Sequence, residues 1–167
     1  MAAVTRVALG GTSVVANWYL DIDTAYPSTA AWVPVSGLME FKPDKNDTLK
    51  DASTFDGHGA MASQKTADQW VLSGKLRRAP QLASLTAYDV GQEKLRTLSE
   101  LYGTSNLAHV RWYEVNGAGQ PVTEAWEGVG CVSWKEDNAS YDDIRVIAFT
   151  ITAYGAKTAV SPNPGSV

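Results

Sequence analysis

Few residues in this chain have the chemistry of a catalytic or metal-binding site. It holds two histidines, His58 and His109, and one cysteine, Cys131. These three cannot make a zinc site of standard spacing. The sequence contains no Gly-X-Ser-X-Gly elbow, no phosphate-binding glycine loop and no Gly-X-Gly-X-X-Gly motif. We therefore expect His109 to be an ordinary surface or interface residue and Cys131 to be a small buried hydrophobe.

Acidic side chains occur in adjacent or nearly adjacent pairs, which raises the question of a calcium site. None of the pairs is followed by the glycine and the glutamate that a calcium loop requires at its sixth and twelfth places. We interpret them as solvated strand ends and loops. The sequence thus predicts no catalytic residue, no cofactor site and no metal site, and the protein is not expected to be an enzyme. The pairs are Asp21/Asp23, Asp44/Asp47, Glu136/Asp137 and Asp142/Asp143.

Length and composition are those of one globular domain. The chain has 167 residues, of which 44% are apolar, and a net charge of −4. Because the basic residues are dispersed, no patch that would hold nucleic-acid phosphates is indicated. One cysteine excludes an internal disulfide and fits a reducing compartment. The first residues do not have the pattern of a signal peptide and no run is long enough to span a membrane, so we expect no membrane anchor.

Alternation of apolar and polar residues predicts at least six strands. Trp18, Trp70 and Trp112 all fall on the apolar faces of their strands, which predicts that they lie in the core. Alternation with one polar face is typical of an antiparallel sheet that packs on one side. The predicted strands cover residues 14–22, 31–41, 68–78, 107–115, 121–134 and 144–154, with a bend or bulge expected at Gly128 and Gly130.

One helix is predicted directly after residue 89. Asp89 can cap it, and Gln92 is placed as the capping-box partner. An apolar stripe at helical spacing follows, and Gly103 is placed to end the segment. The stripe consists of Leu95, Leu98, Leu101 and Tyr102. The fold class that results is mainly β: an antiparallel β-sandwich or open barrel with one flanking helix.

A long polar loop is predicted between the second and third strands, over residues 42–67. Eight of its 26 residues are charged, and its large apolar side chains are Leu49, Phe55 and Met61. Structureless loops of this length are uncommon in compact domains and are usually functional. We expect contact with another molecule to order it. The domain is assigned to residues 1–155, and residues 156–167 are predicted to be a flexible tail.

The strand faces opposite the predicted core are less polar than those of a lone soluble sandwich. Tyr19, Tyr113, Cys131, Val146 and Ala148 all point to that side. Two-sided apolar strands are typical of sheets that meet other sheets. A ring closed by edge-to-edge pairing would also remove exposed sheet edges.

Several segments, taken in order, resemble the major tail tube proteins of long-tailed bacteriophages, in particular those with a non-contractile tail. The resemblance covers about residues 14–155. The segments are NWYLDI, a loop with ASTFDGHG, DQWVLSGKLRR, the helix around EKLRTLSELYG, the hairpin VRWYEVNGAGQPVTEAWEGVGCVSW and the closing strand RVIAFTITAYG.

The resemblance implies a structural virion protein that assembles as hexameric rings stacked into a tube. DNA would pass through the lumen without specific binding during ejection into the host. Other tail proteins, namely the tape measure, the tail terminator and the distal tail protein, would be partners. The location would be the phage tail, after synthesis in the host bacterial cytoplasm. Contacts between subunits and rings would fall on residues 42–67, with Leu49, Thr54, Phe55, Asp56 and Met61 as the contact residues.

Two other interpretations stay open. A tube protein of a type VI secretion or contractile injection system would share the expected fold. A ligand-binding or carbohydrate-binding β-module would instead use its tryptophans as stacking platforms. The direction in which Trp18, Trp70 and Trp112 point separates the second alternative from the first.

Overall fold

A computed structural model describes residues 17–51, 63–116, 121–138 and 143–161. Its strands belong to one antiparallel sheet with the order β2-β1-β5-β6-β7-β4-β3, and β8 pairs with β6 beside this path. A single α-helix, α1, and a 3-10 turn (Gly103–Asn106) lie between β4 and β5. The strands are β1 (Trp18–Asp23), β2 (Trp32–Pro34), β3 (Leu38–Asp51), β4 (Ser63–Arg77), β5 (Leu107–Val115), β6 (Pro121–Glu136), β7 (Val146–Ala153) and β8 (Thr158–Ala159), and α1 spans Val90–Ser99.

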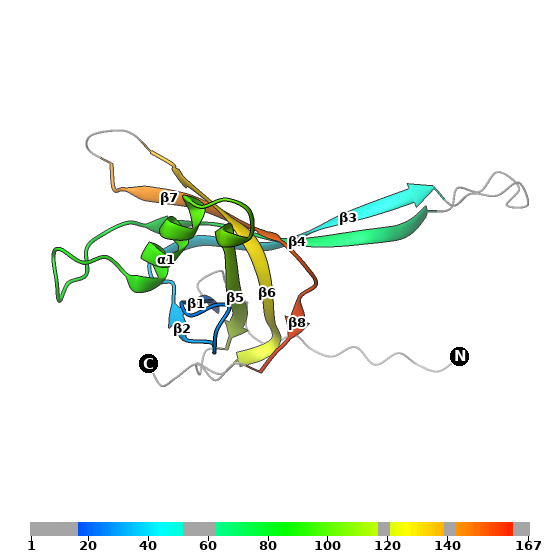
Figure 1. The fold of residues 1–167 in the computed structure, drawn as a ribbon, viewed down its shortest axis with the longest axis horizontal. Coiled ribbons are helices and arrows are strands. Elements are labelled where there is room, and N and C mark those ends of the chain that lie inside the picture. Colours follow the sequence, from blue (N-terminus) through cyan, green and yellow to red (C-terminus); the bar gives the residue numbers. More distant parts are fainter. Residues whose placement is uncertain (1–16, 52–62, 117–120, 139–142, 162–167) are drawn as a thin grey trace, which may run out of the picture.

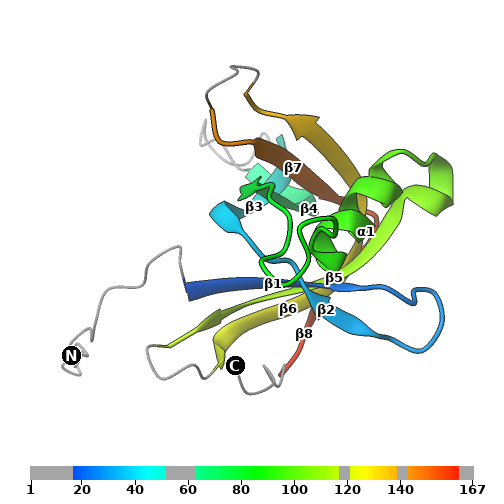
Figure 2. The same ribbon diagram turned by 90° about the vertical axis from the view of Figure 1, so that its left-hand side faces the viewer.

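The long strand β6 takes part in both layers of the folded sheet. Its first half pairs with β5 and β8, and its second half pairs with β7. Gly128 and Gly130 lie at the change-over, under the ring of Trp70. A Cβ atom at Gly128 would lie 2.7 Å from that ring, so glycine is what permits the close approach. Figure 2 shows the two layers that result, with β1, β2, β5 and β8 below and β3, β4 and β7 above.

The core lies between these layers and under the helix. Trp112 is 1% exposed and Trp70 is 5% exposed, and their rings are 4.9 Å apart. Trp18 on β1 contacts Phe41 on β3, with ring centroids 6.0 Å apart, although these strands are far apart in the sheet order. The predicted class is confirmed: a mainly antiparallel, open β structure with one helix. The predicted core position is confirmed for Trp70 and Trp112, while Trp18 is partly buried and packs against the core.

The helix begins as predicted, but its cap differs in one respect. The Asp89 carboxylate accepts a hydrogen bond from the Gln92 backbone N–H at 3.0 Å. The Gln92 side chain does not complete a capping box, because its amide donates to the carbonyls of Ser36 and Arg77 at 2.7 and 3.1 Å. Gln92 therefore joins the helix to the connection between β2 and β3 and to the end of β4.

The apolar stripe predicted for the helix was too long. Leu95 and Leu98 are buried, whereas Leu101 and Tyr102 are 42% and 91% exposed. The helix ends at Ser99, so Leu101 and Tyr102 lie beyond it and no longer follow its spacing. Gly103 has a φ of +60° and opens the 3-10 turn rather than ending the helix itself.

Two other sequence predictions are corrected. The segment 31–41 is not one strand, because β2 ends at Pro34 and β3 starts at Leu38 after Gly37, whose φ is +79°. Cys131 is exposed rather than buried, since it lies on the outer face of β6. After residue 155, β8 pairs with Trp126 and Glu127 of β6.

Candidate assembly surfaces

The predicted loop is, over most of its length, a two-stranded β-hairpin. β3 and β4 pair from Leu38↔Leu76 out to Asp51↔Ser63, with register shifts after Leu38 and after Thr48. This corrects the boundaries predicted for residues 42–67, of which 42–51 and 63–67 are strand. Figure 1 shows β3 and β4 reaching far beyond the rest of the molecule. The predicted contact residues Thr54, Phe55, Asp56 and Met61 lie outside the described residues.

We call residues 44–51 of β3 and 63–69 of β4 the ribbon. β7 covers β4 only from Val71 to Arg77, so the ribbon has no third strand beside it in the part of the chain that the structure describes. Every ribbon residue is exposed, and Leu49, the predicted contact residue described here, is 63% exposed. The ribbon therefore presents two strand edges and two faces to other molecules.

Charge pairs run across the ribbon. Lys65 lies 2.8 Å from a carboxylate oxygen of Asp47 and 2.9 Å from one of Asp68. The hydrogen bond to Asp47 raises the pKa of Lys65, and the hydrogen bond from Lys65 lowers the pKa of Asp68. With three lysines and four aspartates among 15 residues, the ribbon has almost no net charge. The ribbon is thus a polar surface whose charges largely compensate one another. Leu49 is its one large apolar side chain.

The upper layer of the sheet has an open edge at each end. On one side β3 has no partner but β4 among the described strands. On the other side β6 extends past Cys131, where its pairing with β5 stops. Asn106 occupies the first position there, because its side chain bonds both the N–H and the C=O of Val132, at 2.9 and 3.0 Å.

The next residues of β6 leave their backbone groups open on that side. Backbone groups of successive strand residues point alternately to the two sides. The backbone N–H and C=O of Val132 point away from β7. The backbone N–H of Asp137 instead donates to the Val146 carbonyl on β7. Trp134 and Glu136 consequently turn their backbone N–H and C=O groups away from β7. This short edge and the long edge of β3 lie at opposite ends of the layer β3-β4-β7-β6.

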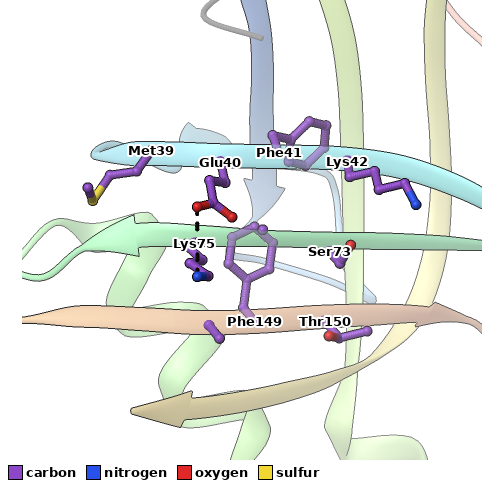
Figure 3. Close-up of a pocket in the computed structure, with 10 residues that line it drawn as sticks. Met39, Glu40, Phe41, Lys42, Ser73, Lys75, Phe149 and Thr150 are labelled. Atoms are coloured by element: carbon purple, nitrogen blue, oxygen red, sulfur yellow. Dashed lines mark ion pairs between the residues drawn. The ribbon is translucent and has the colours of Figure 1, made fainter. Parts of the chain in front are cut away.

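A hollow of about 420 Å³ lies where β3, β4 and β7 run side by side. Figure 3 shows Phe41 and Phe149 in it, with Glu40 and Lys75 forming an ion pair at one end. The Phe149 ring can lie close to β4 because residue 74 is glycine; a Cβ there would be 2.9 Å from the ring. Met39, at the rim, is 55% exposed. The hollow is thus an apolar surface next to the open edge of β3.

The outer face of the lower layer carries a polar cluster that sequence reasoning missed. Asp21 accepts hydrogen bonds from Arg111 at 2.7 Å and from the Tyr113 hydroxyl at 3.2 Å. Burial, together with the negative charge of Asp21, raises the pKa of Tyr113 to about 12. Arg111 also lies over the Trp32 ring at 4.7 Å.

His109 also belongs to this cluster and lies between the carboxylates of Asp23 and Glu127. Its Nδ1 is 3.0 Å from Asp23 and its Nε2 is 2.9 Å from Glu127. Asp23 is 1% exposed and also accepts hydrogen bonds from the backbone N–H groups of Ala25 and Ala31, both at 2.9 Å. Outward charges at alternate positions of two strands were the signal that could have revealed the cluster. The pairing of β1 with β5, which brings them together, was not evident from the sequence.

Two negative findings concern the described residues only. Among them, no group of three histidine, cysteine, aspartate or glutamate side chains is arranged to hold a metal ion. In that same part of the chain, no helix is long and apolar enough to cross a membrane.

Comparison with known proteins identifies the fold. No protein-family model matches the chain, and no curated protein matches its sequence. Among solved structures, it is similar to a chain in the tail of an empty gene transfer agent particle refined with C6 symmetry (TM-score 0.66, 12% identity). The match covers 89% of this chain and 99% of that one. It is also similar to a chain in the virion of a native gene transfer agent (TM-score 0.61, 10% identity, 89% and 99% covered).

A third similar chain is part of the six-fold symmetrised baseplate of the anti-feeding prophage, with a TM-score of 0.60 and 9% identity over 92% of this chain and 98% of that one. All three matches extend over nearly the whole of both chains. The fold is therefore tail-tube-like, the class found in chains of phage-like tails and baseplates. At these identities the likeness concerns the fold alone.

Proposed function

We propose that this protein is the structural subunit of a phage tail tube, assembled as hexameric rings that stack along the tail. The observation that carries the proposal is the pair of open edges at opposite ends of the layer β3-β4-β7-β6. A sheet whose two edges face opposite ways can pair with copies of itself until a ring closes. The C6 symmetry of a tail of similar fold suggests six copies.

Strand direction supports this closure. The layer has four strands, and each pairs antiparallel with its neighbour, so β3 and β6 run in opposite directions. Rotation about a ring axis does not reverse a strand's direction along that axis. The β6 edge of one copy and the β3 edge of the next therefore meet antiparallel, as every other pair in the sheet does. Ring closure introduces no unfavourable pairing.

The face of this layer that points away from the core suits a channel wall. It carries small polar side chains from three strands, because the register pairs Thr150 of β7 with Ser73 of β4 and with Ser133 of β6. Thr152 of β7 lies on the same face. Lys75, on the same face, is 3.0 Å from the Asp137 carboxylate, which offsets its charge. We propose that this face lines the lumen. Lys42, on the same face, likewise lies 2.6 Å from the Asp44 carboxylate. Basic side chains paired with carboxylates hold phosphates weakly, so DNA passes without specific binding.

The ribbon is assigned to contacts with neighbouring copies and neighbouring rings. It is fully exposed, extends beyond the body of the subunit, and leads to residues 52–62, which hold Phe55 and Met61. The proposed role needs no catalysis and no cofactor. Its location is the virion tail, after synthesis in the bacterial cytoplasm, and its partners are the tape measure, tail terminator and distal tail proteins.

A tube subunit of another injection system is the second candidate. The likeness to a chain of the anti-feeding prophage baseplate favours it as much as the gene transfer agent chains favour a phage tail. A carbohydrate-binding module is less well supported. Trp70 and Trp112 are buried and Trp18 packs on Phe41, so none of the three offers an open stacking platform.

Electron microscopy of the purified full chain tests the proposal. We expect rings or tubes by negative stain. The variant Glu136→Pro removes a backbone N–H that points away from β7, while Glu136→Ala serves as the matched control because both lose the ion pair to Arg145. Glu136→Ala should assemble and Glu136→Pro should remain a folded, unassembled subunit. Normal tubes from Glu136→Pro would contradict the β6 edge; monomers of the unaltered chain at high concentration would contradict the function.

A further inference from the structure

His109 lies outside the proposed ring edges, in the polar cluster of the lower layer. It lies on β5, between Asp23 on β1 and Glu127 on β6, so one imidazole ring spans three adjacent strands. Tyr26 and Trp32 cover the ring, with centroid distances of 5.4 and 4.8 Å. The side chain is 17% exposed, so it is largely shielded from water.

The geometry has a consequence for protonation. An ionised carboxylate is an acceptor only, and a neutral imidazole carries one N–H. Both ring nitrogens of His109 face carboxylate oxygens at hydrogen-bond distance. Both contacts are hydrogen bonds only when both nitrogens carry protons, which is the imidazolium form. A neutral ring leaves one nitrogen lone pair facing a carboxylate.

The two carboxylates are not equivalent. Asp23 is buried and also holds the turn between β1 and β2 through Ala25 and Ala31. Burial alone would raise the pKa of Asp23, but the hydrogen bonds from Ala31, His109 and Ala25 together lower it, so Asp23 stays ionised. The Glu127 side chain is 33% exposed and can turn into water. Loss of a proton from His109 is thus least costly at Nε2, which faces Glu127.

We propose that His109 is a protonation-dependent latch that ties the turn between β1 and β2 to β6 when its ring is charged and frees Glu127 when it is neutral. In the charged state the ring donates to Asp23 and to Glu127. On deprotonation the Nε2 proton goes to solvent, Nδ1 keeps its bond to Asp23, and Glu127 turns outward.

Other charged groups around the ring do not replace these two partners. Arg111, on the same strand, is held by Asp21 at 2.7 Å. The turn contributes Tyr26, whose ring contacts the imidazole, and the helix contributes Lys94, which donates to the carbonyl of Thr24 at 3.1 Å. The helix thus holds the start of the turn, and the latch holds Asp23 directly before it.

Nuclear magnetic resonance of the full chain with ¹⁵N-labelled histidine tests the latch, on dispersed subunits in solution or on sedimented tubes by magic-angle spinning. The chain has two histidines, so the signals are separable. At low pH both ring nitrogens of His109 should have imidazolium shifts. As the pH rises, Nε2 should lose its proton while Nδ1 keeps its own, and the backbone signals of residues 24–31 and of Glu127 should move with the same midpoint. The Nε2–H tautomer, or a ring that stays neutral down to pH 5, would overturn the proposal.

Glu127→Gln sharpens the test. The glutamine amide can donate to a neutral Nε2, so the charged ring loses its advantage and the midpoint should fall by about one pH unit, a tenfold change in proton affinity. Glu124→Gln, three residues away on β6 with an exposed side chain, is the matched control and should leave the midpoint unchanged. Equal midpoints for Glu127→Gln and the unaltered chain would overturn the latch. These readouts do not depend on ring assembly, so they can fail while the proposed function holds, and the reverse.

Discussion

The β3–β4 hairpin has an outer part, the ribbon, and an inner part that belongs to the body of the sheet, and the two parts are stabilised differently. At Trp70, strand β4 passes from seven exposed residues, 63–69, into a segment that holds Trp70, Leu72 and Leu76 in the core. Backbone pairing continues through both parts. Only the inner part buries apolar surface, which is the main favourable contribution to folding. Backbone pairing between β3 and β4 thus continues well beyond the core without burial of apolar side chains. We expect neighbours in the assembly to stabilise this outer part.

The largest difference between the two parts should appear at Trp70. Trp70→Ala removes a ring that contacts Trp112, Gly128 and Gly130. We expect it to lower the free energy of unfolding by about 3–5 kcal/mol. Urea denaturation followed by circular dichroism measures this. Its neighbour Gln69→Ala, in the ribbon, is the control and should leave the urea midpoint nearly unchanged; equal losses would show that the core does not end at Trp70.

The apolar residues of segment 52–62, to which the ribbon leads, should matter for assembly instead. The double variant Phe55→Ser, Met61→Ser should fold normally and fail to form tubes, because each buried apolar anchor contributes about 1.5–3 kcal/mol. Negative-stain microscopy and sedimentation measure assembly, and circular dichroism checks the fold. The double variant Ser53→Ala, Ser63→Ala is a control in the same region of the chain. Tubes of normal length from the serine variant would contradict the role assigned to this segment.

Buried charge in the body should cost more to remove than exposed charge in the ribbon. Asp23→Ala leaves two backbone N–H groups and His109 without their acceptor, which should destabilise the protein by about 1–3 kcal/mol at pH 7.

We expect the loss of stability caused by Asp23→Ala to depend on pH. The folded pKa of Asp23 is below its ordinary 3.8, so its contribution is present above that value and is lost as pH falls through the folded pKa. Urea midpoints between pH 2 and 7 measure it. The gap between Asp23→Ala and the unaltered chain should narrow in acid; a constant gap would show that the ionised carboxylate is not the source.

The smallest effect is expected in the charge pairs of the ribbon. Lys65→Ala removes the contacts to Asp47 and Asp68. Solvent screens exposed pairs of this kind, so the melting temperature of the dispersed subunit should be unchanged. Differential scanning calorimetry measures it, with Lys50→Ala as the control. A clear drop for Lys65→Ala would mean that the ribbon contributes to the stability of the free subunit.

Much of the fold was predictable because a strand or helix that packs on the core carries apolar side chains at regular spacing in the sequence. The central strands, the start of the helix at Asp89 and the core positions of Trp70 and Trp112 all follow from side-chain period. The ribbon was missed for the same reason. Its residues are exposed on both faces and carry mixed charges, so the alternation that indicates a strand is absent. Whether the domain boundary at 155 and the contact residues Leu49, Thr54, Phe55, Asp56 and Met61 are right stays a prediction.

The sequence by itself determined the class of the fold, since apolar periods of two and of 3.6 residues select strands and helix wherever one face is buried. The absence of standard catalytic motifs was likewise evident from the residues. Only the tertiary structure decided which strands are neighbours, because pairing depends on contacts between residues far apart in the chain. That decision extends β3 and β4 into a ribbon, leaves the edges of β3 and β6 open, and places His109 between Asp23 and Glu127, residues that lie 86 and 18 positions away.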